Sequence, residues 1–190
     1  MAENVVAPLG MSHTRIRANL GEVVPNSADG YVYAEEAPYR EAIDLGGGGG
    51  ATMGPGGVYT TVDDMARWID NLHTARVGGA GIVGEMTKPQ IKAPGGEDNH
   101  YGYGLSLETY RGQPLIQYGG ADTAHRAMML FFPEINAAVF AMSNNGAFPS
   151  NTIARRTADA FFADDLEPEE DEQVAAAGDG AQSDSPSGAE

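Results

Sequence analysis

The chain has 190 residues and a formal net charge of −16, from 27 acidic and 11 basic residues. It contains no cysteine, which excludes disulfides, thiolate nucleophiles and cysteine-based zinc sites. The acidic balance and the lack of a Lys/Arg cluster argue against nucleic-acid binding, and no apolar run approaches the roughly 20 residues of a membrane span.

The first 57 residues predict little regular structure. Residues 1–4 lack the charged and apolar regions of a signal peptide, so we expect a soluble chain with no export signal within it. Proline and glycine interrupt the stretch before residue 46, which favours loop with at most one helical turn. The glycine-rich run 46–57, with no Lys at P-loop spacing, predicts a flexible or strained loop and not a phosphate site.

An amphipathic helix is predicted over residues 62–73. Thr60 or Thr61 can cap it, and the acidic residues at 63 and 64 complement its dipole. Apolar residues recur at helical spacing, and Trp68 is interpreted as a core residue. Glycines from 78 to 81 end this helix, and a shorter helix is expected around 82–87.

The remainder predicts a β-β-β-β-α order. Strands are expected at 101–107, 115–118, 127–132 and 137–143, and their short connections predict antiparallel neighbours. A final helix follows, capped by Ser150 or Asn151. It is expected to place one broad apolar face on the sheet, formed by Ile153, Ala154, Ala158, Phe161 and Phe162.

We therefore predict an α+β fold with two segments. Residues 1–166 form one domain with an antiparallel sheet of about four strands and flanking helices. Residues 167–190 form a disordered acidic tail, because their composition offers almost nothing apolar to bury.

Several phrases, taken in order, resemble the C-terminal half of the serine β-lactamase-related family. This family includes class C β-lactamases, penicillin-binding proteins, D-Ala-D-Ala carboxypeptidases and family VIII-type esterases. The phrases are Pro8-Leu9-Gly10-Met11, the segment 56–68, the segment 101–105, Tyr118-Gly119-Gly120, Phe132-Pro133-Glu134 and Met142-Ser143-Asn144. The resemblance implies a partial serine β-lactamase/penicillin-binding-protein fold. It also implies a parent that transfers or hydrolyses an ester, amide or β-lactam through an acyl-enzyme.

Two motifs of that family are absent from this sequence. The residues three positions before the two lysines are Glu85 and Pro89, so no Ser-x-x-Lys exists, and no Tyr-x-Asn occurs. In the family both motifs lie upstream of the phrase at 8–11. We interpret the chain as a truncated or fragmentary serine hydrolase that is not self-sufficient for catalysis. The alternative is a non-catalytic binding or chain-completing module of the same fold, and a third hypothesis is an enzyme with a different nucleophile.

The third family motif, Lys-Thr-Gly or His-x-Gly on a strand lining the pocket, corresponds to Tyr118, Gly119 and Gly120. The resemblance implies that the backbone N–H of Ala121 contributes to an oxyanion hole. Tyr118 carries no positive charge, which disfavours carboxylate-bearing substrates. His125 is a possible pocket residue. Ser143-Asn144-Asn145 fits Ser-x-Asn but is interpreted as structural.

No cofactor or metal is expected, because the four histidines are too far apart for a local metal motif. The expected partner is a small ester-type or amide-type substrate in the intact parent. Met128, Leu130 and Phe132 alternate with Met129 and Phe131, so both faces of the sheet need covering. We therefore expect possible self-association through an uncovered part of the sheet.

Overall fold

The computed structural model describes residues 1–17, 22–34, 37–42, 56–94 and 98–168. For residues 33–34 and 37–42 it describes the backbone alone. The predicted glycine-rich run 46–50 and nearly all of the predicted acidic tail, from residue 169, lie outside the described residues. No helix in the described segments is long and apolar enough to cross a membrane.

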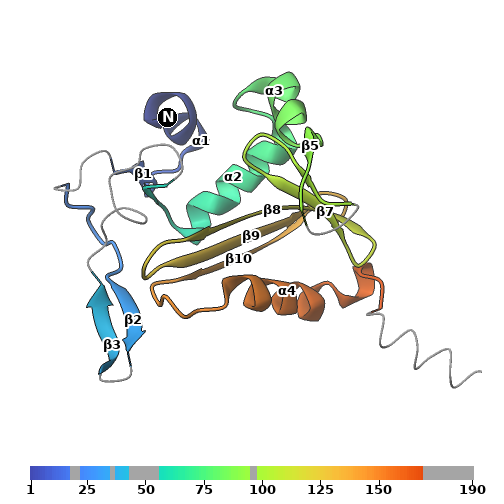
Figure 1. The fold of residues 1–190 in the computed structure, drawn as a ribbon. Helices are drawn as coiled ribbons and strands as arrows, with labels where there is room; N and C mark the ends of the chain where they lie inside the picture. The colour runs from blue at the N-terminus through green and yellow to red at the C-terminus, as the bar shows by residue number, and fades with distance from the viewer. Residues whose placement is uncertain (18–21, 35–36, 43–55, 95–97, 169–190) are drawn as a thin grey trace, which may run out of the picture.

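A six-stranded antiparallel sheet forms the centre of the fold, and each of its strands pairs with the next in sequence (Figure 1). The order is β10-β9-β8-β7-β6-β5. The strands are β5 (Ile91–Lys92), β6 (His100–Tyr101), β7 (Ser106–Tyr110), β8 (Gln113–Ala121), β9 (Arg126–Phe132) and β10 (Ala137–Ser143).

The strand predicted over residues 101–107 is two strands, β6 and β7, and that prediction was wrong in its continuity. The chain between them turns at Gly104, which has a φ of +78°. Gly102 lies so close to the carbonyl oxygen of Met86 that a Cβ could not fit there. The two glycines therefore break the alternating pattern that the flanking residues follow.

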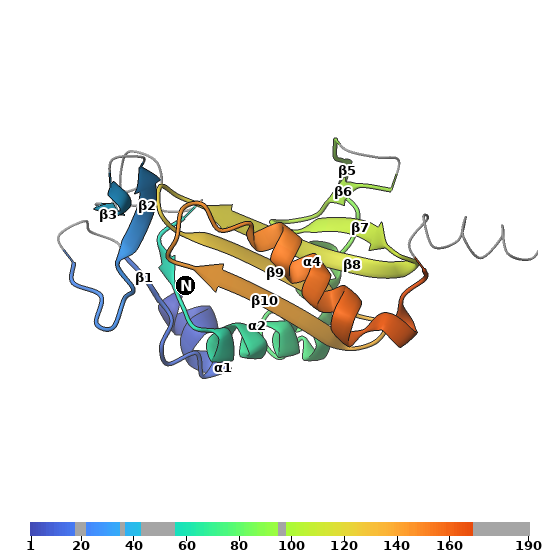
Figure 2. The same cartoon turned by 90° about the horizontal axis from the view of Figure 1, so that it is seen from below.

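The two faces of the sheet are covered by different helices (Figures 1 and 2). On one face lie α2 (Val62–Thr74) and α3 (Gly79–Met86), and on the other lies α4 (Ser150–Phe161). The predicted bounds of the first helix agree with α2 to within one residue, and α4 lies where the final helix was predicted. The helix expected at 82–87 begins three residues earlier.

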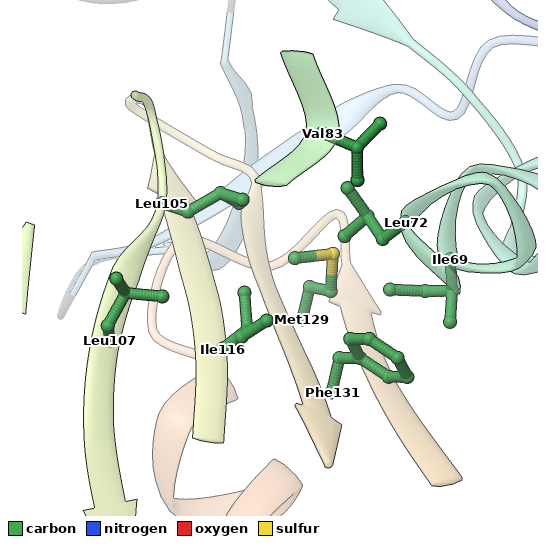
Figure 3. Close-up of a cluster of buried hydrophobic side chains, with 8 residues drawn as sticks. All are labelled: Ile69, Leu72, Val83, Leu105, Leu107, Ile116, Met129 and Phe131. Carbon is green, nitrogen blue, oxygen red and sulfur yellow. The ribbon is translucent and has the colours of Figure 1, made fainter. Parts of the chain in front are cut away.

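The core on the α2 face is formed by side chains from two helices, three strands and the loop before β7 (Figure 3). Trp68 packs against it, as predicted. Burying each such aliphatic or aromatic side chain stabilises the fold by about 1.5–3 kcal/mol. The buried members are Ile69, Leu72, Val83, Leu105, Leu107, Ile116, Met129 and Phe131.

The core on the α4 face is built around β9 and β10, with Ala154 and Ala158 of the helix fully buried against it. Phe162 packs there too, in an edge contact with Phe132 whose ring centroids are 5.9 Å apart. The prediction for Phe161 was wrong, since 79% of it is exposed, and Ile153 is 39% exposed. The strands alternate as predicted, and the buried apolar side chains on each face are covered by helices of this chain.

The first 42 residues contain more regular structure than the sequence predicted. A π-helical stretch (Ala2–Val6) leads into α1 (Ala7–Leu9), and β1 (Arg15–Ile16) pairs with β4 (Val58–Tyr59). A hairpin of β2 (Gly30–Ala34) and β3 (Ala37–Ala42) follows. Three of the prolines and glycines that suggested loop lie at element ends: Pro8 is in the first turn of α1, Gly10 is its left-handed cap, and Gly30 is the first residue of β2.

A buried carboxylate joins this N-terminal part to α2. Asp64 has no exposed surface and accepts hydrogen bonds from the backbone N–H of His13 and the hydroxyl of Thr14, both at 2.8 Å. Arg67 donates to its other oxygen at 2.9 Å. Thr61 caps the helix as predicted, with its hydroxyl accepting from the Asp64 N–H.

On its flank toward β7, α4 is held by a polar cluster. Arg155 donates to Glu108 and Gln117, and its guanidinium lies 4.7 Å from the centre of the Tyr110 ring. The Tyr110 hydroxyl donates to Asp159 at 2.8 Å. The predicted cap by Ser150 or Asn151 is wrong, because Pro149 occupies the cap position without a side-chain bond and the Asn151 side chain accepts from Arg155 instead.

We predict that Asp64→Asn lowers the free energy of unfolding by about 2–4 kcal/mol. The carboxylate of Asp64 accepts from three donors, whereas the amide of an asparagine has a single, uncharged oxygen to accept from them. Urea denaturation of the purified chain measures this. The matched control is Asp63→Asn, an exposed neighbour in the same helical turn, which should cost less than about 0.5 kcal/mol. Equal losses in the two variants would contradict the anchoring role of Asp64.

A second prediction concerns alkaline pH. Burial, followed by the hydrogen bond to Asp159, raises the pKa of Tyr110 from 10.0 to about 12. Because the folded state holds this proton more tightly than the unfolded chain, the stabilisation is fully present below pH 10 and is lost as the pH rises toward 12. The difference in unfolding free energy between the unmodified chain and Tyr110→Phe should therefore shrink over this range. A difference that is constant with pH would refute the assignment.

Candidate functional site

The four residues expected at the third motif form the end of one strand. Tyr118, Gly119, Gly120 and Ala121 are the last residues of β8. The neighbouring strand β7 begins at Ser106, which pairs with Gln117, so these four residues extend past it. In the described part of the chain they therefore have β9 on one side and no paired strand on the other.

The direction of the backbone N–H groups follows from the ladder. The N–H of Asp122 donates to the carbonyl of His125, the residue just before β9, at 3.2 Å. Because N–H groups of successive residues in a strand point to opposite edges, the N–H of Ala121 points away from β9. It lies on the side where β7 has ended, and it can donate to an oxygen of a bound ligand.

Tyr118 lies on the α2 face of the sheet, the face that carries Ile116 and Met129. Nearly half of Tyr118 is exposed, at 47%. Partial burial raises the pKa of Tyr101 above its usual value of 10, and a hydrogen bond with the Tyr118 phenol adds to this. The hydroxyl of the partly exposed Tyr118 can both donate and accept a hydrogen bond.

A floor of small residues separates Tyr118 from His125 on this face. The register places Gly120 opposite Ala127, between the Tyr118–Met129 pair and the turn that begins at Asp122. A Cβ on Gly120 would meet nothing within 4 Å. The half-exposed Met142 of β10 pairs with Ala127 and borders the same floor. The surface above these small residues is therefore open between the side chains of Tyr118 and His125.

His125 is held by hydrogen bonds on both ring nitrogens. Its Nδ1 lies 3.1 Å from an oxygen of Asp122, and its Nε2 lies 3.1 Å from the carbonyl oxygen of Ala28. The side chain of Arg126, the next residue, lies on the α4 side of the sheet. Its guanidinium donates to the carbonyls of Asp122 and His125. The sequence found His125 as a possible pocket residue but gave no indication of its contact with Ala28.

The Ser-x-Asn segment holds a loop together. The Ser143 hydroxyl accepts from the N–H of Asn145 at 3.1 Å, and the Asn144 amide donates to the carbonyl of Asp29 at 2.7 Å. The side chain of Asn145 accepts from the N–H of Ala147 at 2.9 Å. All three side chains are thus engaged in backbone contacts, two of them local and one, from Asn144, with the distant Asp29.

Clusters of metal-ligating side chains and surface hollows are two other kinds of site. Among the described residues no group of three His, Cys, Asp or Glu side chains could hold a metal ion. A hollow of about 370 Å³ opens near β6 and β7, lined in part by His100, Glu108 and Pro114. None of the four third-motif residues lines it, so this hollow and the strand end of β8 are separate features.

Comparisons with known proteins identify the family and the fold. A family model described as Beta-lactamase matches residues 1–164. No curated protein matches the chain.

Solved structures share the fold. An octameric penicillin-binding protein homologue from Pyrococcus abyssi is 20% identical, with a TM-score of 0.75 over 88% of this chain and 37% of that one. A penicillin-binding protein from Bacillus halodurans is 22% identical, with a TM-score of 0.67 over 82% and 47%. A D-stereospecific amidohydrolase from Streptomyces sp. is 15% identical, with a TM-score of 0.64 over 84% and 46%. The chain thus spans less than half the length of each of these three.

Proposed function

This chain belongs to the beta-lactamase family, a family of serine hydrolases, and from that membership we propose that it carries the substrate-binding strand of a serine hydrolase without the nucleophile. The observation that carries the proposal is the end of β8. There Tyr118, Gly119, Gly120 and Ala121 extend beyond β7 and border an open floor.

The proposed role of Ala121 is to donate one hydrogen bond to the oxyanion of an acyl-transfer intermediate. Its N–H points to the open edge of β8, away from β9. A two-donor hole needs a second N–H, which in the family comes from the nucleophilic serine. This sequence contains no Ser-x-x-Lys, so the chain would contribute half of the hole.

The proposed substrate is a small ester or amide without a carboxylate at this strand. Tyr118 replaces the cationic or imidazole group of the family motif, and a phenol offers hydrogen bonds but no charge to attract a carboxylate. The fold shared with a D-stereospecific amidohydrolase is compatible with an amide substrate.

A second candidate is a non-catalytic binding or chain-completing module. One observation favours it: both faces of the sheet are covered by helices of this chain, with a buried core on each side. A chain with two such cores contains what independent folding requires. An in-frame Ser-x-x-Lys in the DNA upstream of the Met1 codon would favour the hydrolase proposal over this one.

We predict that the isolated chain forms no acyl-enzyme with a fluorescent β-lactam or an activated ester, because no Ser-Lys pair is present to activate a hydroxyl. Mass spectrometry after incubation with the probe measures covalent addition. Labelling of one serine at a one-to-one ratio, abolished when that serine is changed to Ala, would overturn the proposal that the nucleophile is absent.

We also propose that the chain self-associates through the edge of the sheet at β10. Within the described residues β10 pairs with β9 alone, its sequence carries no charge, and the exposed Phe161 lies at the end of the helix beside it. Uncharged edge strands and exposed aromatic side chains favour association. The homologue from Pyrococcus abyssi is described as octameric.

Light scattering at increasing protein concentration tests this association. The apparent mass should rise with concentration, and Phe161→Ser should reduce the rise. Val23→Ser is the matched control, since Val23 is 83% exposed but lies outside the sheet and α4, and it should leave the rise unchanged. A constant monomer mass at all concentrations would contradict the proposal.

A further inference from the structure

A short segment that ends with the first two residues of β2, Gly30 and Tyr31, is docked on the end of the sheet beside the candidate site (Figure 1). The N–H of Tyr31 donates to the carbonyl of Asn144, and the N–H of Gly146 donates to the carbonyl of Tyr31, both at 2.8 Å. The Asn144 side chain holds the carbonyl of Asp29 at 2.7 Å. These contacts bind the segment to the loop that follows β10.

His125 binds the same segment to the β8–β9 turn. Its Nε2 lies 3.1 Å from the Ala28 carbonyl, and its Nδ1 lies 3.1 Å from Asp122. The docked segment also approaches the turn too closely for a side chain, because a Cβ on Gly30 would lie 2.5 Å from the Cβ of Ala124 and 2.8 Å from Cε1 of His125. The glycine is thus required for the contact.

The hydrogen-bond chemistry of this bridge requires a charged imidazole. A backbone carbonyl only accepts, so Nε2 must carry a proton to bond Ala28. Asp122 also acts as an acceptor, because its Oδ1 takes hydrogen bonds from the N–H groups of Ala124 and His125, at 2.7 and 2.5 Å. Nδ1 must then donate as well. Both bonds exist together only when both ring nitrogens are protonated.

The charged groups around the ring come from three places. Asp122 lies on its own turn and is directly bonded to it. The Arg126 guanidinium donates to the His125 carbonyl and opposes the imidazolium charge. The docked segment contributes the carboxylate of Asp29. The loop after β10 contributes Asn144 and Asn145, whose side chains carry no charge. The ion pair with Asp122 is the one direct charge contact that His125 makes among the described residues.

We propose that His125 is a proton-dependent positioning residue, whose imidazolium joins Asp122 to Ala28 and so fixes the segment Ala28–Tyr31 as the end wall of the floor beside Tyr118. Loss of one ring proton removes one of the two bonds, and the wall then loosens. The description of this floor as a substrate site rests on the proposed function, whereas the proton-dependent docking does not.

Amide hydrogen exchange of the ¹⁵N-labelled full chain tests the docking directly. Protection factors of the Tyr31 and Gly146 amides are compared between about pH 5.5 and pH 8.5, on either side of the range in which imidazoles ordinarily titrate. We expect the Tyr31 protection factor to fall roughly tenfold or more at the higher pH, as is typical of losing a hydrogen bond to a charged group. The Leu130 amide at the centre of β9 should not change.

Two variants and one control complete the test. His125→Gln should abolish the pH dependence at Tyr31, whereas His100→Gln should retain it, because His100 lies on β6 and bonds the carbonyl of Asp98. Gly30→Ala should lower the Tyr31 protection at both pH values in a chain that still carries histidine at position 125. If the His125→Gln variant also loses protection at the Leu130 amide, Gly30→Ala provides an independent measure of undocking.

Equal Tyr31 protection at the two pH values in the unmodified chain would overturn the proposal. So would a pH dependence that survives in His125→Gln. Neither readout uses hydrolysis or acylation, so failure of the positioning role is distinguishable from failure of the proposed function.

Discussion

The need to bury a sheet on both faces governs this structure. In β9 the four residues from Met129 to Phe132 are all buried, so successive side chains are removed from water on opposite faces of the sheet. A strand of this kind is stable only between two covering layers. The positions of α2 and α4 follow from it, since α2 covers Met129 and Phe131 while α4 covers Leu130 and Phe132. The two small residues Ala154 and Ala158 let α4 approach the sheet closely.

The candidate site arises from a difference in strand length. β8 has 9 residues and β7 has 5, so the end of β8 extends beyond its neighbour. At that end the side chains become small, and the surface between Tyr118 and His125 stays open. A backbone donor and a neutral phenol then face the same open region. The site thus depends on where a neighbouring strand stops, and the rigid core holds it in place.

The parts of the fold that could be predicted from the sequence are those governed by local periodicity. The 3.6-residue pattern of α2, its Thr61 cap and the alternation in β9 and β10 were visible because each depends on residues near one another in the chain. The contacts of Asp64 with His13 and Thr14 were not visible, because they join residues 51 and 50 positions apart. The same holds for His125 and Ala28, 97 positions apart. In the site, the motif residues were identified by resemblance, but their partners on other segments had no local pattern.

The anchoring of the N-terminal residues at Asp64 has a consequence for the order of folding. The six strands of the sheet form a meander in which every pair is adjacent in sequence, so each pairing closes a short loop. The bond from Thr14 to Asp64 closes a loop of 50 residues. The ordering entropy of that loop must be offset by bonds such as those from His13 and Thr14 to Asp64, made on a surface that already exists. The sheet with α4 is therefore expected to form as an early nucleus, and the N-terminal residues to add late. In the reverse direction they are the first cooperative unit to detach.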